Sequence, residues 1–333
     1  MRVQKPGRRW RWTIVALILG VLFMPVLIRQ LMPPESRKLE RVALADTAYT
    51  EVEFQNRVQH LALAGMIFVP EGEGPFPAAV VIHGSGTSRR DNGWYVTLAK
   101  HLQDNGIVVL LPDKRGSEKS DGDWRTSSLE DLATDTLAAV EYLREQQSVP
   151  LSGIGVIGMS QGGWIAPIVA SLDDDLAFLV SMVGAAVTPR EQLIYEENHN
   201  LRQTGFLPGI SNVLSYVGYA NVRYLAQRQW YDKIVDYDPL PYWRDVTVDS
   251  LALYGADDTN VPSADSVKRL VDLGNPRIRV EVYEGSGHAL ESPRGDGNSI
   301  IRRDVLDAIT VFIRGTQLKQ RSPASGSPHL ETQ

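Results

Sequence analysis

The chain has 333 residues and no cysteine, which excludes a disulfide scaffold and catalysis by a thiolate. It also lacks a cluster of cysteine and histidine residues and the pattern H-E-x-x-H, so the spacing of a zinc site is missing. The phosphate-binding pattern G-x-x-x-x-G-K-[ST] does not occur, and nucleotide hydrolysis is unsupported. We therefore expect a protein that uses neither a metal ion nor a bound cofactor.

Positive charge is scarce outside the N-terminal segment. The formal net charge is −6, but the first eleven residues hold five basic and no acidic side chains, which leaves 29 basic against 40 acidic ones in the remainder. General binding of nucleic acid depends on neutralising phosphates, and an acidic body argues against it. We expect no nucleic-acid partner.

The most informative motif is the sequence Gly158-Met-Ser-Gln-Gly-Gly163. It follows an apolar run, residues 154–157, and leads into a helical pattern that begins at Trp164. A G-x-S-x-G pattern between a strand and a helix is typical of a serine nucleophile, because the sharp turn projects the hydroxyl out of the sheet. We interpret Ser160 as the nucleophile, and we expect the backbone N–H of Gln161 to face the anion that forms beside it.

A serine nucleophile needs a base and a group that orients the base. His288 lies in a glycine-rich loop that follows a strand pattern at 278–283, and Asp257 and Asp258 follow an earlier strand pattern at 250–255. This is the order serine, acid, histidine that such a turn predicts. We interpret His288 as general base and then general acid, and Asp258 as the residue that orients its imidazole, with the adjacent Asp257 as the rival.

Further motifs extend this pattern over about residues 48–315. They read His83-Gly-Ser-Gly86, Asp113-Lys-Arg-Gly116, Tyr237-Asp-Pro-Leu-Pro-Tyr-Trp243, Gly255-Ala-Asp-Asp-Thr-Asn-Val-Pro262 and Gly287-His288. With them, the chain resembles the serine α/β-hydrolases. It is most similar to bacterial esterases and acyl-CoA thioester hydrolase-like enzymes, which are related to dienelactone hydrolases and prolyl oligopeptidases.

The resemblance has consequences for the fold and the site. It implies an α/β-hydrolase fold, with a mostly parallel eight-stranded sheet flanked by helices. It favours Asp258 over Asp257, because the spacing from Gly255 to Pro262 is similar to the acid loop of the family. It also implies an oxyanion hole formed by the N–H groups of Gln161 and Ser85.

Two basic residues, Lys114 and Arg115, follow the strand pattern at 107–111. They either bind an anionic substrate or form salt bridges within the scaffold. The chain departs from the family just beyond them, where Ser117-Glu-Lys-Ser120 replaces the usual second glycine. That loop lies near the mouth of the site, so the departure concerns substrate access rather than the chemistry.

Alternating strand and helix patterns predict a mostly parallel sheet with right-handed crossovers. The alternation stops at about 188–249, where helical patterns rich in aromatic residues predict a cap inserted between the nucleophile and the acid. We expect a linker at 33–47, a hydrolase domain at 48–315 that includes this cap, and a disordered tail at 316–333.

The N-terminal segment, residues 1–32, combines basic residues with an uncharged and mostly apolar run of sixteen residues at 13–28. We expect a transmembrane helix that anchors the protein through residues 10–32, with a single pass and with the catalytic domain on the extracytoplasmic (periplasmic) side. The competing interpretation is a signal peptide, with secretion of the protein after cleavage.

We expect a serine hydrolase that cleaves a small carboxylic ester or thioester through an acyl-enzyme intermediate. Three alternatives use the same sequence features. They are a serine peptidase of the prolyl oligopeptidase-like type, an acyltransferase with an acceptor other than water, and a non-catalytic, membrane-tethered binding protein.

Overall fold

The computed structural model describes residues 8–32 and 37–321. Its sheet has eight strands in the order β1-β2-β4-β3-β5-β6-β7-β8. The pairs β1–β2 and β2–β4 are antiparallel and the other pairs are parallel, which confirms the predicted mostly parallel sheet. The strands are β1 (Thr50–Asn56), β2 (Leu61–Phe68), β3 (Phe76–Ile82), β4 (Val108–Pro112), β5 (Leu151–Met159), β6 (Leu179–Met182), β7 (Ser250–Gly255) and β8 (Ile278–Tyr283).

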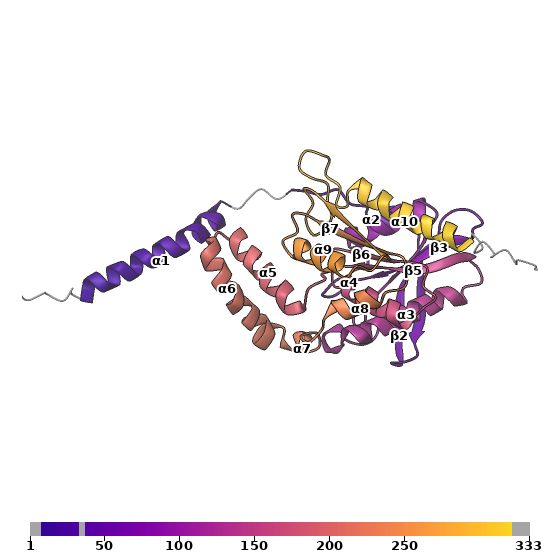
Figure 1. The fold of residues 1–333 in the computed structure, drawn as a ribbon, viewed down its shortest axis with the longest axis horizontal. Helices are drawn as coiled ribbons and strands as arrows, with labels where there is room; N and C mark the ends of the chain where they lie inside the picture. The colour runs from indigo at the N-terminus through magenta and orange to yellow at the C-terminus, as the bar shows by residue number, and fades with distance from the viewer. Residues whose placement is uncertain (1–7, 33–36, 322–333) are drawn as a thin grey trace, which may run out of the picture.

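Helices cover both faces of this sheet, as predicted (Figure 1). One face carries α2 (Gly93–Asp104) and α10 (Arg303–Arg321). The opposite face carries α3 (Leu129–Glu145), α4 (Gly162–Leu172), α8 (Pro239–Asp245) and α9 (Ser263–Asp272).

The central strands are apolar on both faces because each face is covered. Along β3, Ala78 and Val80 pack into the cluster under α3 and α4, whereas Ala79 and Val81 pack into the cluster under α2 and α10. This is the period of two that a strand imposes on its side chains. A continuous apolar run is typical of such a doubly covered parallel strand.

Capping residues fix where the flanking helices begin. Ser128 and Asp131 form a capping box at the start of α3, since each side chain accepts a hydrogen bond from the backbone N–H of the other. Asn92 caps α2 by accepting from the N–H of Trp94. Such caps satisfy N–H groups that the first helical turn leaves unpaired.

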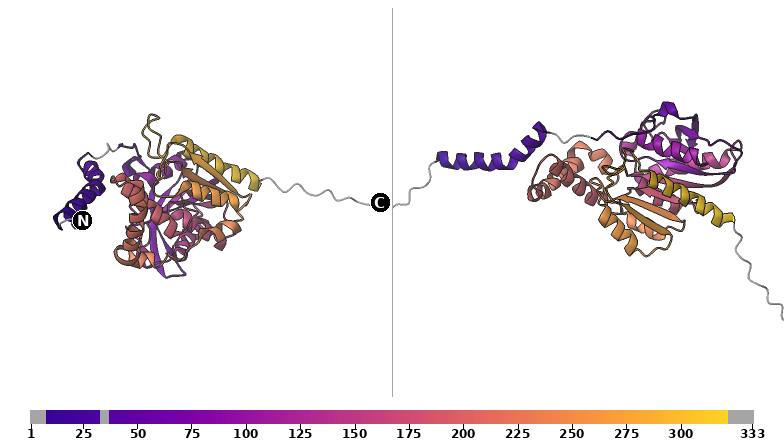
Figure 2. Two further views of the ribbon diagram at one scale, coloured as in Figure 1. Left: turned by 60° about the vertical axis from the view of Figure 1, so that its left-hand side comes forward. Right: turned by 90° about the horizontal axis from the view of Figure 1, so that it is seen from above.

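The segment between β6 and β7 forms a helical unit, here called the cap. It contains α5 (Pro189–Gln203), α6 (Pro208–Asn221), a π-helical turn (Val222–Ala226), α7 (Arg228–Tyr231) and α8. Helices α5 and α6 lie side by side beyond the edge of the α/β body (Figures 1 and 2). Two short 3₁₀ turns lie elsewhere, at Leu44–Asp46 and Trp124–Thr126, and the second of these faces the cap at α7.

Helix α1 spans Arg8–Leu31. Across residues 8–32 and 37–321, no helix combines the length and the apolar character that a membrane crossing requires. The uncharged run in α1 has sixteen residues, whereas a span needs about 20. This finding contradicts the predicted transmembrane anchor at 10–32, and with it the predicted single-pass, extracytoplasmic localisation. Residues 1–7 of the N-terminal segment lie outside the described part.

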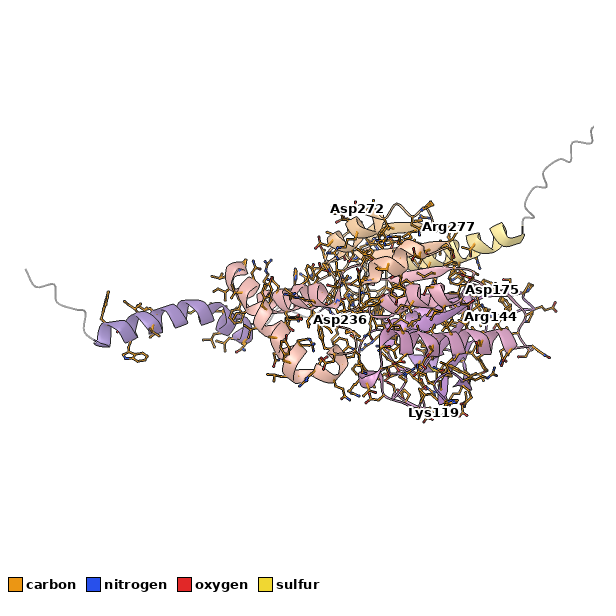
Figure 3. The ribbon with its side chains drawn as sticks, turned by 60° about the horizontal axis from the view of Figure 1, so that its bottom comes forward. Lys119, Arg144, Asp175, Asp236, Asp272 and Arg277 are labelled. Atoms are coloured by element: carbon orange, nitrogen blue, oxygen red, sulfur yellow. The ribbon has the colours of Figure 1, made fainter. Side chains whose placement is uncertain are left out.

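The predicted tail overlaps α10, which continues to Arg321; residues 322–333 lie outside the described part. Charged side chains such as Lys119, Arg144 and Asp272 lie on the outer surface of the body (Figure 3). Ion pairs between such exposed groups contribute little to stability. The stability of the body therefore depends mainly on the two apolar clusters.

Trp243 of α8 is fully buried and packs in the cluster that contains α4, so it connects the cap to the body. We expect Trp243→Ala to lower the free energy of unfolding by about 3–5 kcal/mol, because it removes a large buried ring and leaves a cavity. Tyr216 of α6 is 56% exposed, and Tyr216→Ala should change that free energy by about 0.5 kcal/mol or less. Urea denaturation of both variants checks the prediction, and equal losses would contradict it.

Candidate active site

Ser160 occupies the sharp turn between β5 and α4. Its φ of +55° is in the left-handed region, which a serine adopts only where its surroundings hold it. Close backbone approach does this here: a Cβ on Gly158 would lie 2.2 Å from the carbonyl oxygen of Gly162. The N–H of Ser160 donates to the carbonyl of Met182 at 2.9 Å, which joins the turn to β6.

A chain of hydrogen bonds links the serine to the two predicted partners. His288 Nε2 lies 2.9 Å from Ser160 Oγ, and His288 Nδ1 lies 2.8 Å from Asp258 Oδ2. Asp258 follows β7 and His288 follows β8, so both loops leave the sheet at the same edge as the turn after β5. The structure therefore brings together all three residues that the motif order put forward.

The carboxylate of Asp258 is buried and fully hydrogen-bonded. Its Oδ1 accepts from the N–H groups of Asn260 and Val261 at 2.8 and 2.9 Å, which leaves Oδ2 for the histidine. Its own carbonyl accepts from the hydroxyl of Tyr195 in the cap, at 2.7 Å. The neighbouring Asp257 is exposed, so the loop directs only one of the two carboxylates toward His288.

The loop after β3 brings the backbone of Ser85 to the same edge. Within the described part of the chain, the N–H groups of Ser85 and Gln161 have no hydrogen-bond acceptor. The N–H of Gly84, by contrast, donates to Tyr95 Oη at 2.8 Å. Burial raises the pKa of Tyr95 to about 12, so its hydroxyl stays neutral. The two N–H groups named as oxyanion donors are therefore both available, and that of Gly84 is not.

The contacts of His83 are those of a residue that supports the loop after β3. Its ring packs against Tyr95 with 4.3 Å between centroids, and its Nε2–H donates to the carbonyl of Pro112 at 2.7 Å. Burial lowers the pKa of His83 to about 4, so the ring is neutral near pH 7. It contacts the base of the loop rather than the serine.

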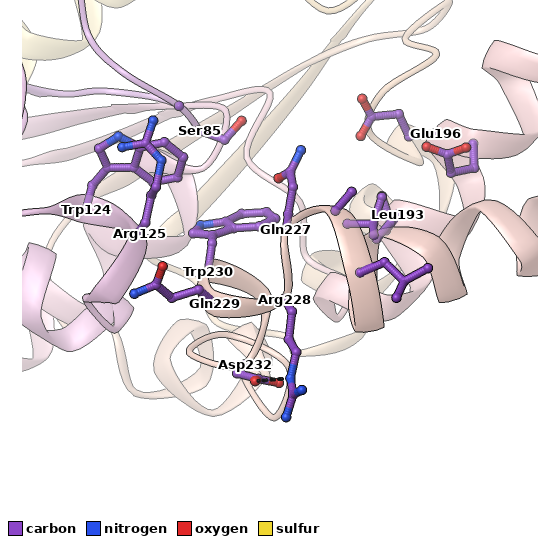
Figure 4. Close-up of a pocket in the computed structure, with 15 residues that line it drawn as sticks. Ser85, Trp124, Arg125, Leu193, Glu196, Gln227, Arg228, Gln229, Trp230 and Asp232 are labelled. Carbon is purple, nitrogen blue, oxygen red and sulfur yellow. Dashed lines mark hydrogen bonds and ion pairs between the residues drawn. The ribbon is translucent and has the colours of Figure 1, made fainter.

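A cleft of about 880 Å³ lies between the body and the cap (Figure 4). Ser85 and Trp124 line it from the body, and Leu193 and Glu196 line it from α5. A smaller cavity beside Ser160 shares Ser85, Leu193 and Glu196 with this cleft. The volume is in the range of small-molecule sites, and the cleft provides a route from the cap to the serine.

Two residues near the site, Tyr95 and Glu196, were not predicted to act there, and Lys114 was predicted only as either a contact for an anionic substrate or a salt bridge within the scaffold. Glu196 lies in the cap on the wall of the cleft; burial raises the pKa of its carboxyl, and the charge of nearby His288 acts in the opposite direction. Lys114 is buried behind the loop that follows β3, where its ammonium contacts Gly84. The only sequence signal for these residues was their position, within helical patterns or at a strand end.

In residues 8–32 and 37–321, no group of three or more acidic or histidine side chains is arranged to hold a metal ion.

Comparison with solved structures identifies the fold. An α/β-hydrolase named GrgF, from Penicillium sp. sh18, is 20% identical with a TM-score of 0.61, over 81% of this chain and 99% of that one. The Pyrococcus furiosus esterase Pf2001 is 18% identical with a TM-score of 0.61, over 84% of this chain and 98% of that one. At such identities the likeness shows the fold alone, which is the predicted α/β-hydrolase fold.

Comparison with protein families is more specific. The family described as BAAT / Acyl-CoA thioester hydrolase C terminal matches residues 137–321, more than half of the chain, and the chain belongs to this family. The dienelactone hydrolase family matches residues 63–203. These matches confirm the predicted membership of the serine hydrolase superfamily.

Several relatives of known name share this similarity. Esterase EstD of Thermotoga maritima is 28% identical over 252 residues, which are 71% of this chain and 60% of the relative. Thiohydrolase aneE of Aspergillus aculeatus is 32% identical over 152 residues, 45% of this chain and 46% of the relative. Human acyl-coenzyme A thioesterase 1 is 26% identical over 244 residues, 69% of this chain and 52% of the relative. The chain thus spans about half of the length of these relatives, whose names refer to the hydrolysis of esters or thioesters.

The hydroxyl of Tyr95 generates a prediction about the stability of the loop that follows β3. Tyr95→Phe leaves the buried N–H of Gly84 without its acceptor, so we expect the free energy of unfolding to fall by about 1–3 kcal/mol. Tyr224→Phe alters a ring that is 60% exposed and should change it by about 0.5 kcal/mol or less. Thermal and urea unfolding check this, and an unchanged Tyr95→Phe protein would contradict the contact.

Proposed function

We propose that the protein hydrolyses carboxylic esters or thioesters through an acyl-enzyme intermediate on Ser160. The observation that carries this proposal is the continuous hydrogen-bond chain from Ser160 Oγ through His288 to Asp258 Oδ2. The chain lies beside two N–H groups without an acceptor, and Ser160 lines a small cavity that adjoins the larger cleft. The family and the names of the relatives support ester and thioester bonds as the targets.

Each residue then has a defined role in the reaction. His288 Nε2 takes the proton of the Ser160 hydroxyl as Oγ attacks the carbonyl carbon of the substrate. Asp258 accepts the hydrogen bond from Nδ1–H and so keeps Nε2 free as the base. The negative oxygen of the tetrahedral intermediate accepts hydrogen bonds from the N–H groups of Ser85 and Gln161.

The intermediate collapses when the bond from the carbonyl carbon to the leaving oxygen or sulfur breaks. The alcohol or thiol leaves with the proton from His288, and the acyl group remains on Ser160. A water molecule then gives a proton to His288 and attacks the carbonyl carbon of the acyl-enzyme. The bond to Ser160 Oγ breaks, His288 returns the proton to this oxygen, and the acid is released. The cleft under the cap is where the substrate would bind, with Leu193 and Trp230 as apolar contacts.

Removal of the nucleophile tests the proposal directly. We expect Ser160→Ala to keep the fold, since the alteration removes one hydroxyl, and to hydrolyse neither a p-nitrophenyl acyl ester nor an acyl thioester. Steady-state rates and circular dichroism check this. A folded variant that retains hydrolysis of either substrate would contradict the role of Ser160.

The adjacent carboxylates Asp257 and Asp258 provide a matched pair of variants. Asp258→Asn should lower kcat by about 10⁴-fold, because the amide no longer holds the imidazole in the required tautomer. Asp257→Asn, at the exposed neighbour, should leave kcat within about twofold. The ratio of the two kcat values checks the assignment, and similar losses in both variants would show that the orientation of His288 does not depend on Asp258 alone.

A further inference from the structure

Lys114 is a buried cation that the reaction above does not use. It follows β4 and is only 8% exposed. Its ammonium Nζ donates to the carbonyl oxygen of Gly84 at 2.8 Å and to Oε1 of Gln161, also at 2.8 Å. It lies 5.2 Å from the ring centroid of Trp124, and Trp124 lines the cleft.

The neighbouring Arg115 is a buried cation with a structural role, because it has a carboxylate partner. Its guanidinium is paired with Asp135 at 2.6 Å, on the side of the loop that faces α3. Lys114 has no carboxylate partner among residues 8–32 and 37–321, and its acceptors are a carbonyl and an amide. A buried charge without a counter-ion is unfavourable for folding, so its position calls for another explanation.

Each of the two acceptors of Lys114 is connected to one of the two proposed oxyanion donors. The carbonyl of Gly84 and the N–H of Ser85 are parts of one peptide unit, so a cation at the carbonyl oxygen polarises this N–H and fixes its direction. The second acceptor is the side chain of Gln161, whose backbone N–H is the other proposed donor. One ammonium thus contacts both halves of the proposed oxyanion hole.

We propose that Lys114 is a positioning residue, which holds the Ser85 and Gln161 N–H groups around the oxyanion and places a positive charge behind them. The inference rests on the proposed function and adds a residue to it. In the ground state the carbonyl oxygen of the substrate carries only a partial charge, whereas in the tetrahedral intermediate it carries a full one. The contribution of Lys114 therefore appears in kcat far more than in KM.

The protonation state of Lys114 gives this role a pH dependence. Burial lowers the pKa of Lys114 to about 7, so the ammonium is present below that pH and is lost as the pH rises through it. The titratable and charged groups around it are neutral or paired: His83 is a buried neutral ring, Asp113 is paired with Arg90, and Arg115 is paired with Asp135. Arg125 stacks on the ring of Trp124. We expect kcat to fall on the alkaline side of neutrality.

Lys114→Met tests the proposal, because it keeps an unbranched side chain and removes the charge. We expect kcat for a p-nitrophenyl ester to fall by about 10²–10³-fold, with KM within about threefold of the wild type. The alkaline limb of the pH profile should disappear. Affinity for a phenylboronic acid, which forms an anionic tetrahedral adduct with a serine, should fall by a factor similar to that for kcat.

Arg115→Met is the matched control, since it removes a buried cation from the same loop on the side away from the serine. It should lower thermal stability, yet keep kcat and boronate affinity within about threefold and retain the alkaline limb.

If Lys114→Met keeps kcat, or loses kcat while the alkaline limb stays intact, the inference is overturned. If Lys114→Met does not fold, the wild-type profile decides: a kcat that stays constant from pH 7 to 10 overturns the inference. A wild type that fails to react with a fluorophosphonate probe at Ser160 would instead contradict the proposed function.

Discussion

The close backbone contact at the turn around Ser160 is the constraint on which the site depends. Gly158 has no room for a side chain because the backbone of Gly162 lies against it, and Gly162 has none because the carbonyl of Ile82 does. Ser160 is held at a φ of +55° between these two glycines. The turn ends β5, which lies in the middle of the sheet between β3 and β6. The loop after β3 therefore reaches the serine from one side, and the loops after β7 and β8 reach it from the other.

This arrangement separates two kinds of charge around one hydroxyl. The carboxylate of Asp258 lies beyond His288, where the proton of the serine would go, and the ammonium of Lys114 lies behind Ser85 and Gln161, where negative charge would develop. Both charges are buried, so they act through a medium that screens them weakly. In the proposed reaction, proton and electron pair move in opposite directions, each toward the charge that stabilises it.

Much of the site could be predicted from the sequence, because the hydrophobic pattern locates the strands and their order shows which loops lie at the same edge of the sheet. Ser160, Asp258 and His288 each follow a strand pattern, and the carboxyl ends of parallel strands meet at one edge. The choice between Asp257 and Asp258 depended on a resemblance, since spacing alone does not show which way a loop turns. The direction in which the Lys114 side chain points could not be predicted, because its contact with Gly84 joins residues thirty positions apart.

The prediction of a membrane anchor was wrong. Basic and aromatic flanks suggested a span, but no helix of the described part is long and apolar enough to form one.

The central claim is that the acyl group of the substrate is transferred to Ser160. The most direct measurement is mass spectrometry of the protein quenched during turnover of an acyl ester, followed by mapping of the modified peptide. The account predicts an added mass equal to the acyl group less one hydrogen, located on Ser160. An adduct on another residue, or rapid turnover with water incorporated and no adduct at any quench time even when deacylation is slowed by low temperature, would contradict it.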